Sequence, residues 1–560
     1  MSKRPIYPVK CLLDLNCPAD DGVRLSTDVY LPVKDDPKAS WPVIFIRTPY
    51  NNNDPVKKVP LARAFASEGY AVAIQDVRGR HDSEGVWYPS FNEAKDGLAS
   101  QKWIAEQPWC DGRIALYGRS YEGYSVWVQT FGHHPAVKAI IPIVALPDPV
   151  INVPWQNGSV MWNMITWSLM VHGHTNQDIS QYDWKSLYGF RPLNKLDEQL
   201  GFESKPWRDW MEHHLKDDYW KPACYMHRMA ELDIPALHIS GWYDDDLPST
   251  INNYPECRKV AKSKDGQYLL MGPWPHATNT KSVIEGVDFG EDEVIDISGF
   301  ILDWLDMAMC GHPENWGNNG RCYVFEMGSN TWKWHDDWPP PDGKEKSYYL
   351  HSGGKANSLN GNGKLLDAPS DDGSDFDEYI YDPDNPTPYL QDPYTLQIGG
   401  PFDARPVEQR DDVLCFDTPV FDKEFSINGR LFAELFVSSS AEDTEFCAKL
   451  CDVHPDGLSR QLNDGNIRLA LRNSLEKQDP VPPNEITKVT VDMWATGIRI
   501  FKGHKLRLEI SSSAVPKFAA HTNTLEPPGS AVRTVIAKNR VYHSKKHRSR
   551  VIMTICNTDF

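Results

Sequence analysis

Short runs of apolar residues alternate with stretches of helical spacing along the first part of the chain. The apolar runs are residues 43–46 (VIFI), 71–74 (AVAI), 114–117 (IALY) and 139–144 (AIIPIV). The stretches of helical spacing are residues 61–68, 93–107 and 124–131. Strands that are apolar throughout are buried on both faces, and strands separated by helices usually pair in parallel. The pattern therefore predicts a parallel sheet covered by helices on both faces.

Strand signals disappear between residues 147 and 234, a stretch rich in Trp, Met and His. Apolar runs return at residues 236–239 (ALHI) and 268–271 (YLLM). A helical unit inserted between two strands of one sheet typically forms a cap over it. We therefore expect an α/β domain made of residues 1–146 and 235–340, with residues 147–234 as a helical cap.

The pattern changes again after residues 338–343 (WPPPDG), which are a strong linker signal. Short segments that alternate apolar and polar residues follow, for example residues 431–437 (LFAELFV) and 505–510 (KLRLEI). Residues 358–377 are rich in Gly, Ser and Asp and predict a loop. Many short strands with period-two alternation are typical of a β sandwich or jelly roll, which we expect for residues 341–560.

Length and charge narrow the class of protein. The chain has 560 residues, more than the roughly 250–300 at which a single core stops growing, so several domains are expected. Its net charge of −19 argues against nucleic acid and anionic membranes as partners, because both require a basic surface. The sequence contains no run of about 18 apolar residues, so no transmembrane helix is expected. The 11 scattered cysteines and the lack of a signal-peptide pattern favour a cytoplasmic protein. The sequence leaves open whether the protein forms a homo-oligomer.

Residues 118–123 (GRSYEG) lie between the predicted strand 114–117 and the predicted helix 124–131. A serine on a sharp turn between a strand and a helix is the context of a nucleophile elbow. The usual pattern has a glycine two residues after the serine, whereas here Glu122 holds that position and Gly123 follows. The segment therefore predicts Ser120 as a nucleophile, with a purely structural turn as the other interpretation.

A nucleophilic serine needs a base, and the base needs an orienting acid. In α/β-hydrolases the acid and then the histidine follow the serine in the chain, each just after a strand. Asp244 follows strand 236–239 through residues 240–243 (SGWY), and His276 follows strand 268–271 through residues 272–275 (GPWP). Order and placement predict a triad of Ser120, Asp244 and His276.

Acyl transfer also needs hydrogen-bond donors for the oxyanion of the tetrahedral intermediate. The backbone N–H of Tyr121, directly after the nucleophile, is one candidate. The second donor normally comes from a loop after an early strand, here residues 47–52 (RTPYNN). This loop lacks a Gly-rich stretch, so the hydroxyl of Tyr50 is the candidate, and an ordinary turn tyrosine is the alternative.

Several segments together resemble the family of cocaine esterase, α-amino acid ester hydrolases and X-prolyl dipeptidyl peptidases. The earlier ones are residues 47–50 (RTPY), 75–80 (QDVRGR), 118–123 (GRSYEG), 241–244 (GWYD) and 272–276 (GPWPH). The later ones are residues 325–332 (FEMGSNTW), 442–446 (EDTEF), 452–457 (DVHPDG) and 503–508 (GHKLRL). The resemblance covers residues from about 15 to about 525. Members of this family carry the glycine three residues after the serine. The position of Gly123, which departs from the usual elbow pattern, therefore matches the family.

The resemblance implies an α/β-hydrolase domain, an inserted helical cap and a C-terminal jelly roll. It implies that Ser120, Asp244 and His276 form the triad and that Tyr50 donates its hydroxyl to the oxyanion. Asp76 and Arg78 lie in a shared segment, where we interpret them as paired charges that hold a loop.

The resemblance leaves the substrate open. Some members carry an aromatic residue two after the catalytic Asp, for an apolar acyl group, and others carry an acid for a substrate ammonium. This chain has Asp246 there, preceded by Asp245, and a solvated acidic loop is the alternative. Further candidates for substrate contacts are the aromatic residues Trp155, Trp162, Trp167, Trp242 and Phe402. For Trp155, Trp162 and Trp167, a place in the core of the cap is the alternative.

These observations predict a serine hydrolase that cleaves esters or amides of small acyl compounds through an acyl-enzyme on Ser120. An aminopeptidase or an acyl transferase with the same triad is an alternative, and a non-catalytic ligand-binding protein is a remote one. We expect neither a metal nor a cofactor. The adjacent pairs His133–His134 and His213–His214 do not have the i, i+4 spacing of helical metal ligands.

Overall fold

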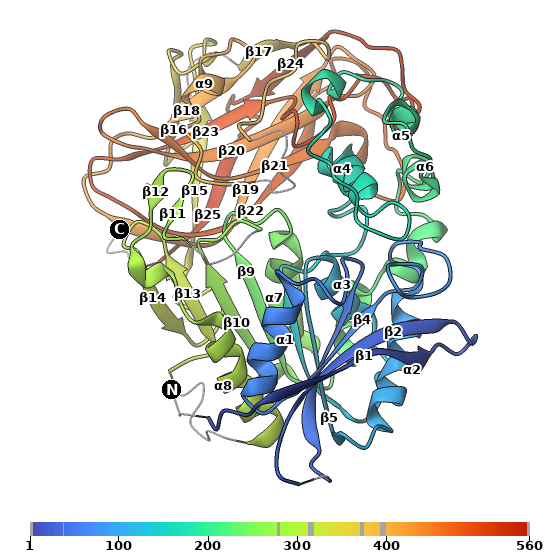
Figure 1. Ribbon diagram of the computed structural model, residues 1–560. Coiled ribbons are helices and arrows are strands. Elements are labelled where there is room, and N and C mark those ends of the chain that lie inside the picture. Colours follow the sequence, from blue (N-terminus) through green and yellow to red (C-terminus); the bar gives the residue numbers. More distant parts are fainter. Residues whose placement is uncertain are drawn as a thin grey trace.

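The computed structural model describes residues 4–36, 38–276, 281–311, 319–369, 375–391 and 399–556. Figure 1 shows an α/β part, in blue to green, beneath a β-rich part, in yellow to red. The segment that carries α4–α6, in teal, lies beside the β-rich part.

The α/β part is built on a ten-stranded sheet in the order β1-β2-β4-β3-β5-β6-β9-β10-β13-β14. Pairing is parallel from β4 to β13 and antiparallel at both edges. The strands are β1 (Val9–Pro18), β2 (Arg24–Pro32), β3 (Trp41–Thr48), β4 (Ala71–Asp76), β5 (Cys110–Arg119), β6 (Val137–Ile143), β9 (Ala236–Gly241), β10 (Gln267–Gly272), β13 (Cys322–Glu326) and β14 (Thr331–His335). The predicted parallel sheet is therefore present.

Each face of this sheet buries its own hydrophobic core. Alternate residues of one strand point to opposite faces, so Val43 and Phe45 belong to one core and Ile44 and Ile46 to the other. Helices α2 and α3 contribute to the first core, and α1 and α8 to the second (Figure 1). The helices of this part are α1 (Lys58–Ser67), α2 (Glu93–Ala105), α3 (Tyr121–Val128), α7 (Leu247–Val260) and α8 (Ile297–Cys310).

The chain between β6 and β9 carries short helices separated by irregular segments. The helices are α4 (Asn163–Met170), α5 (Leu196–Gln199) and α6 (Lys205–Glu212), with several 3₁₀ turns. The structure adds a hairpin that the sequence did not predict, formed by β7 (Trp155–Gln156) and β8 (Ser159–Val160). Its turn residues Asn157 and Gly158 both have positive φ, as a two-residue hairpin of the primed type requires.

The inserted segment shares its core with the C-terminal part. Phe518, Ala519 and Tyr389 pack in the same cluster as the tryptophans of the insertion. Backbone hydrogen bonds add to this contact, because the N–H of Trp162 donates to the carbonyl of Lys517 and the N–H of Ala519 donates to that of Val160. The inserted segment is thus packed against the C-terminal part.

The C-terminal part is an eleven-stranded sheet in the order β17-β24-β19-β25-β15-β16-β18-β23-β20-β21, with β22 on β19. All pairs are antiparallel except β16 with β18. The strands are β15 (Lys344–His351), β16 (Gly363–Leu366), β17 (Phe376–Tyr381), β18 (Leu414–Asp417), β19 (Phe425–Ser439), β20 (Glu445–Val453), β21 (Ser459–Arg468), β22 (Thr487–Ile500), β23 (Lys505–Ser511), β24 (Ala537–Tyr542) and β25 (Arg550–Cys556). This confirms the predicted C-terminal β domain.

Smaller elements complete the molecule. They are β11 (Val283–Ile284), β12 (Val287–Asp288) and α9 (Arg405–Glu408). The predicted loop at residues 358–377 was wrong in part, because it contains β16 and the start of β17, while residues 370–374 lie outside the described segments. In the parts of the chain that the structure describes, every helix is too short or too polar to cross a bilayer.

Candidate active site

Ser120 stands on a strained turn between β5 and α3. Its φ of 59° and ψ of −127° lie in a region that non-glycine residues rarely occupy. Two glycines make the turn possible: a Cβ on Gly118 would approach the carbonyl oxygen of Glu122 to 2.3 Å, and one on Gly123 that of Ile143 to 2.8 Å. The close approach of α3 to β6 therefore explains why the second glycine stands three residues after the serine.

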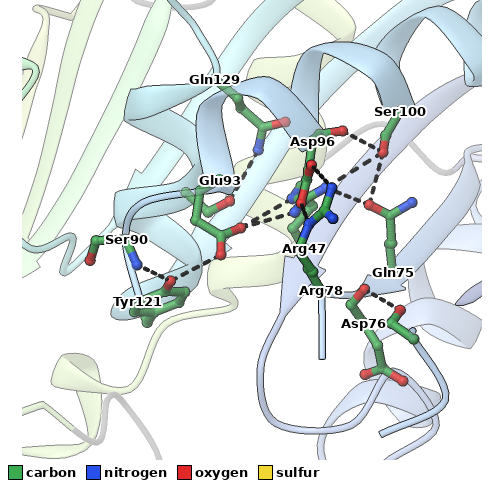
Figure 2. A network of polar contacts seen from close by, with 12 residues as sticks. Arg47, Gln75, Asp76, Arg78, Ser90, Glu93, Asp96, Ser100, Tyr121 and Gln129 are labelled. Atoms are coloured by element: carbon green, nitrogen blue, oxygen red, sulfur yellow. Dashed lines mark hydrogen bonds and ion pairs between the residues drawn. The ribbon is translucent and has the colours of Figure 1, made fainter. Parts of the chain in front are cut away.

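Tyr121 is the first residue of α3, so its backbone N–H has no partner within the helix. The positive end of the helix dipole adds to the field at this point. The side chain of Tyr121 points into a buried polar network, where its hydroxyl accepts a hydrogen bond from the N–H of Ser90 (2.7 Å) and donates one to Glu93 (3.0 Å) (Figure 2). The network fixes the first turn of α3 behind the serine.

Figure 2 shows how this network continues to the β strands. Glu93 forms a buried ion pair with Arg47 (3.0 Å), which also donates to Gln75 (2.6 Å). The expected pairing of Asp76 with Arg78 was wrong. Arg78 binds Asp96 (2.7 Å) and Asp21 (2.9 Å).

Asp76 accepts the N–H of Asn52 instead, at 2.8 Å. Burial raises the pKa of Asp76 to about 8. Asn52 follows Tyr50 by two residues, so this hydrogen bond holds the loop that presents Tyr50.

Tyr50 lines the same cavity as Ser120. Its hydroxyl accepts a hydrogen bond from the indole Nε1 of Trp167 (3.0 Å). Burial raises the pKa of Tyr50 above its usual value, although the side chain of Ser120 acts to lower it, so the phenol stays protonated. Because Trp167 already donates to the phenol oxygen, the hydroxyl proton of Tyr50 is left to donate to another acceptor.

His276 faces three consecutive carboxylates. Its Nδ1 lies 3.2 Å from Asp244 Oδ1, 3.3 Å from Asp245 Oδ1 and 3.7 Å from Asp246 Oδ2. The strands that precede these residues are paired, with Gly241 opposite Gly272, so their two carboxyl ends meet at one edge of the sheet. The carboxylate of Asp244 also accepts the N–H of Asp246 (2.7 Å), which fixes the turn.

The charges in this group perturb one another. Burial lowers the pKa of His276, but the three carboxylates, Asp244 foremost, outweigh it and raise the pKa to about 9. Burial raises the pKa of Asp245 to about 7 although His276 opposes it. Burial and the neighbouring Asp245 raise the pKa of Asp246 well above its usual value. Full ionisation of three buried carboxyl groups beside one imidazole would leave excess negative charge, so the group favours binding of a proton or of another cation.

A cavity of about 900 Å³ opens in front of the serine. Six residues predicted from the sequence line it: Tyr50, Ser120, Tyr121, Trp167, Asp246 and His276. Asp244 is fully buried and contacts His276 from outside this lining.

Four other predicted residues do not lie among those that line this cavity. Trp155 is fully buried in the core of the insertion, where its Nε1 donates to the carbonyl of Trp210 (3.0 Å). Trp162 lies in the same core. Trp242 donates to the carbonyl of Phe325 (2.8 Å) and belongs to the core of the C-terminal part. The ring of Phe402 packs edge-on against that of Tyr389, with 6.0 Å between centroids.

Residues that the sequence did not single out for the pocket complete its walls. Trp210 stacks on Trp167, with centroids 6.3 Å apart, and Trp220 also faces the cavity. Asp245 contributes a second carboxylate to the lining, and its position beside Asp246 was the one signal for it in the sequence. Lys58, also in the lining, forms an ion pair with Glu122.

Family models match both halves of the chain. The model of the X-Pro dipeptidyl-peptidase (S15 family) matches residues 21–278, and that of the X-Pro dipeptidyl-peptidase C-terminal non-catalytic domain matches residues 314–552. A cocaine esterase from Rhodococcus sp. (strain MB1 Bresler) is 32% identical, over 96% of this chain and 97% of that protein.

Solved structures show the same fold. An α-amino acid ester hydrolase has a TM-score of 0.86 at 23% identity, and an aminopeptidase from the marine sediment archaeon Thaumarchaeota archaeon has 0.85 at 22%. Each comparison covers 98% of this chain and 97% of the other. The chain belongs to the S15 X-Pro dipeptidyl-peptidase family, which includes cocaine esterase, and is a serine hydrolase that acts on esters or amides.

Proposed function

We propose that this protein hydrolyses esters or amides of small acyl compounds through an acyl-enzyme on Ser120. The observation that carries the proposal is the arrangement at the cavity: a strained serine, a tyrosine in the same lining, and a histidine held by a buried carboxylate. These are the nucleophile, oxyanion donor, base and orienting acid that acyl transfer requires.

In this mechanism the hydroxyl of Ser120 attacks the carbonyl carbon while neutral His276 takes its proton. Asp244 holds the imidazole and stabilises the imidazolium that forms. The oxyanion is bound by the hydroxyl of Tyr50 and the backbone N–H of Tyr121. The imidazolium then protonates the leaving alcohol or amine. Water, activated by the same histidine, hydrolyses the acyl-enzyme.

We also propose that the acyl pocket favours groups that carry an amine. The carboxylates of Asp245 and Asp246 line the cavity and are almost fully buried, where an uncompensated charge is costly. A substrate ammonium would compensate them, and Trp167 in the same lining adds a cation–π surface. Since burial raises the pKa of both carboxyl groups, binding of the ammonium should release a proton.

The same feature supports a second candidate function, an aminopeptidase. An ammonium site beside the serine suits the free α-amine of a peptide as well as that of an amino acid ester. An acyl transferase differs only in the group that captures the acyl-enzyme, an amine in place of water. Values of kcat/KM for matched esters, amides and dipeptides, with and without an added amine, would separate the three.

Fluorophosphonate labelling tests the proposed chemistry, because only an activated serine reacts. We expect the wild type to be labelled stoichiometrically and Ser120→Ala to stay unlabelled. Ser90→Ala is the matched control, because Ser90 lines the same cavity and should leave labelling intact. A wild type that does not react would favour the non-catalytic ligand-binding protein, and loss of labelling in the control alone would move the nucleophile to Ser90.

A further inference from the structure

Two histidines and an aspartate meet at one end of the C-terminal sheet, among residues that do not line the active-site cavity. Asp452 is near the end of β20, His454 follows in the next turn, and His504 precedes β23. β20 and β23 are antiparallel neighbours, with Asp452 opposite Leu506. Strand pairing therefore brings together two segments that lie about fifty residues apart in the chain.

The distances between the polar atoms are those of a ligand set. Nδ1 of His504 lies 2.9 Å and 3.0 Å from the two carboxylate oxygens of Asp452, and Nε2 of His454 lies 3.6 Å from Oδ2. One ligand atom from each residue falls within 4.8 Å of the other two. Around tetrahedral zinc, with bonds of about 2.0–2.1 Å, neighbouring ligand atoms are about 3.3–3.4 Å apart. The distances from the two histidines to Asp452 bracket that value, and the two histidine nitrogens lie within 4.8 Å of each other.

A simple hydrogen-bonded pair would need only one of these imidazoles. The ring of His454 lies 4.5 Å from that of His504 at an interplanar angle of 37°, and a nitrogen of each ring lies within 3.6 Å of the carboxylate of Asp452. The side chain of Asp452 is 6% exposed and that of His504 12%, whereas that of His454 is 35% exposed. Two of the three side chains, those of Asp452 and His504, are thus largely buried, and that of His454 is accessible to solvent.

We propose that Asp452, His454 and His504 bind a divalent transition-metal ion, with Zn²⁺ the best fit. Imidazole nitrogen and carboxylate oxygen are ligand types that zinc accepts, and three protein ligands leave a fourth position for water. The ion would join the turn after β20 to the turn before β23. Because it would bind the folded chain and not the unfolded one, it would raise the thermal stability of the protein.

The test is a calorimetric titration of the chelator-treated, full-length protein with Zn²⁺, supported by the visible absorption of bound Co²⁺. We expect one ion per chain and a rise in Tm on addition of Zn²⁺. His454→Gln should weaken binding by at least about 10–100-fold, the cost of losing even an indirect partner of a metal ligand. This variant keeps the hydrogen bond between Asp452 and His504, so it should fold, and circular dichroism checks that it does.

His213→Gln is the matched control. His213 is a partly exposed histidine that also contacts one carboxylate, Asp217, at 2.7 Å, but it is not part of a three-ligand group of described residues. We expect the control to bind Zn²⁺ like the wild type. Equal binding by wild type and His454→Gln, or no binding by either, would overturn the proposal.

Two other groups of described residues could compete for the cation: the three aspartates with His276 at the active site, and the buried Glu408, Cys451 and Glu509. The active-site group is the one whose occupation would affect catalysis. Zn²⁺ bound there would block the base and inhibit ester hydrolysis. Binding that disappears in Asp246→Asn and persists in His454→Gln would also overturn the proposal. Full ester hydrolysis at Zn²⁺ concentrations that saturate the protein would support it.

Discussion

Replacement of Asp246 by asparagine tests the proposed acyl pocket most directly. The change keeps the size of the side chain and removes its charge. Asn152, which donates to Asp246 at 3.3 Å, can still donate to an amide oxygen at residue 246. Only 4% of the Asp246 side chain is exposed, so solvent screens its charge little.

The expected loss follows from the contact that the charge would make. A hydrogen bond to a charged group contributes about 1.5–3 kcal/mol, and about 1.4 kcal/mol corresponds to a tenfold change. This gives a loss of about tenfold to about a hundredfold for an amine-bearing acyl group. Asp245 remains in the lining as a second carboxylate, so we expect a value near the lower end, about tenfold.

The assay is kcat/KM for a phenylglycine ester against the matched phenylacetate ester, in wild type and Asp246→Asn. Both are measured at one pH below the pKa of the substrate amine, about 7.7–8.0 for an α-amino group, so that the amine carries its charge. The ratio of the two esters within each protein cancels the effect of Asp246 on the pKa of His276. We expect a preference for the amine in the wild type that falls about tenfold in the variant. Equal selectivity in the two proteins would refute the reasoning and leave a plain aromatic acyl pocket.

Further predictions concern the groups around the serine. Ser120→Ala should lower kcat by about 10⁴-fold or more with binding nearly intact, and near wild-type turnover would contradict the assignment. His276→Ala should lower kcat as much as Ser120→Ala, and the double variant should be little worse than either, because triad members act as a unit. If the loss in the double variant were the product of the two single losses, a shared mechanism would be excluded. Tyr50→Phe should reduce kcat by about 10²–10³-fold with KM little changed, and an effect on KM alone would make Tyr50 a substrate contact. The base must be neutral, so kcat/KM for a neutral ester should rise as the pH passes the raised pKa of His276, about 9. Asp246→Asn removes a carboxylate that raises this pKa, so its profile should move to lower pH, and an unchanged profile would argue against the coupling.

The sheet was predictable from the sequence because its strands are apolar throughout. Residues 43–46 and 114–117 became β3 and β5, buried on both faces. The elements that were missed are too short to show a period. The hairpin β7–β8 has two residues in each strand, and β16 is held by pairing with β15 and β18, which lie elsewhere in the sequence.

In the candidate site, too, some residues could be predicted from the sequence and others could not. Ser120, Asp244 and His276 each follow a strand of one parallel sheet, so chain order alone predicts that they meet. Which tryptophans reach the cavity depends on packing between segments far apart in the chain. The indole N–H of Trp155 donates to a backbone carbonyl of the same insertion, whereas that of Trp167 donates to the hydroxyl of Tyr50. Nothing in the local sequence distinguishes the two.

The insertion packs against the β-rich part, so the catalytic half of the protein depends on the C-terminal half for its structure. Trp167 and Trp210, which wall the cavity, belong to or pack against the same cluster as Phe518 and Ala519, from the far end of the sequence. A shortened chain that kept Ser120 and His276 but ended before β15 would lose the support on which those walls rest. Modular redesign of this enzyme, by exchange of one half for that of a relative, would therefore have to carry the insertion together with the C-terminal sheet.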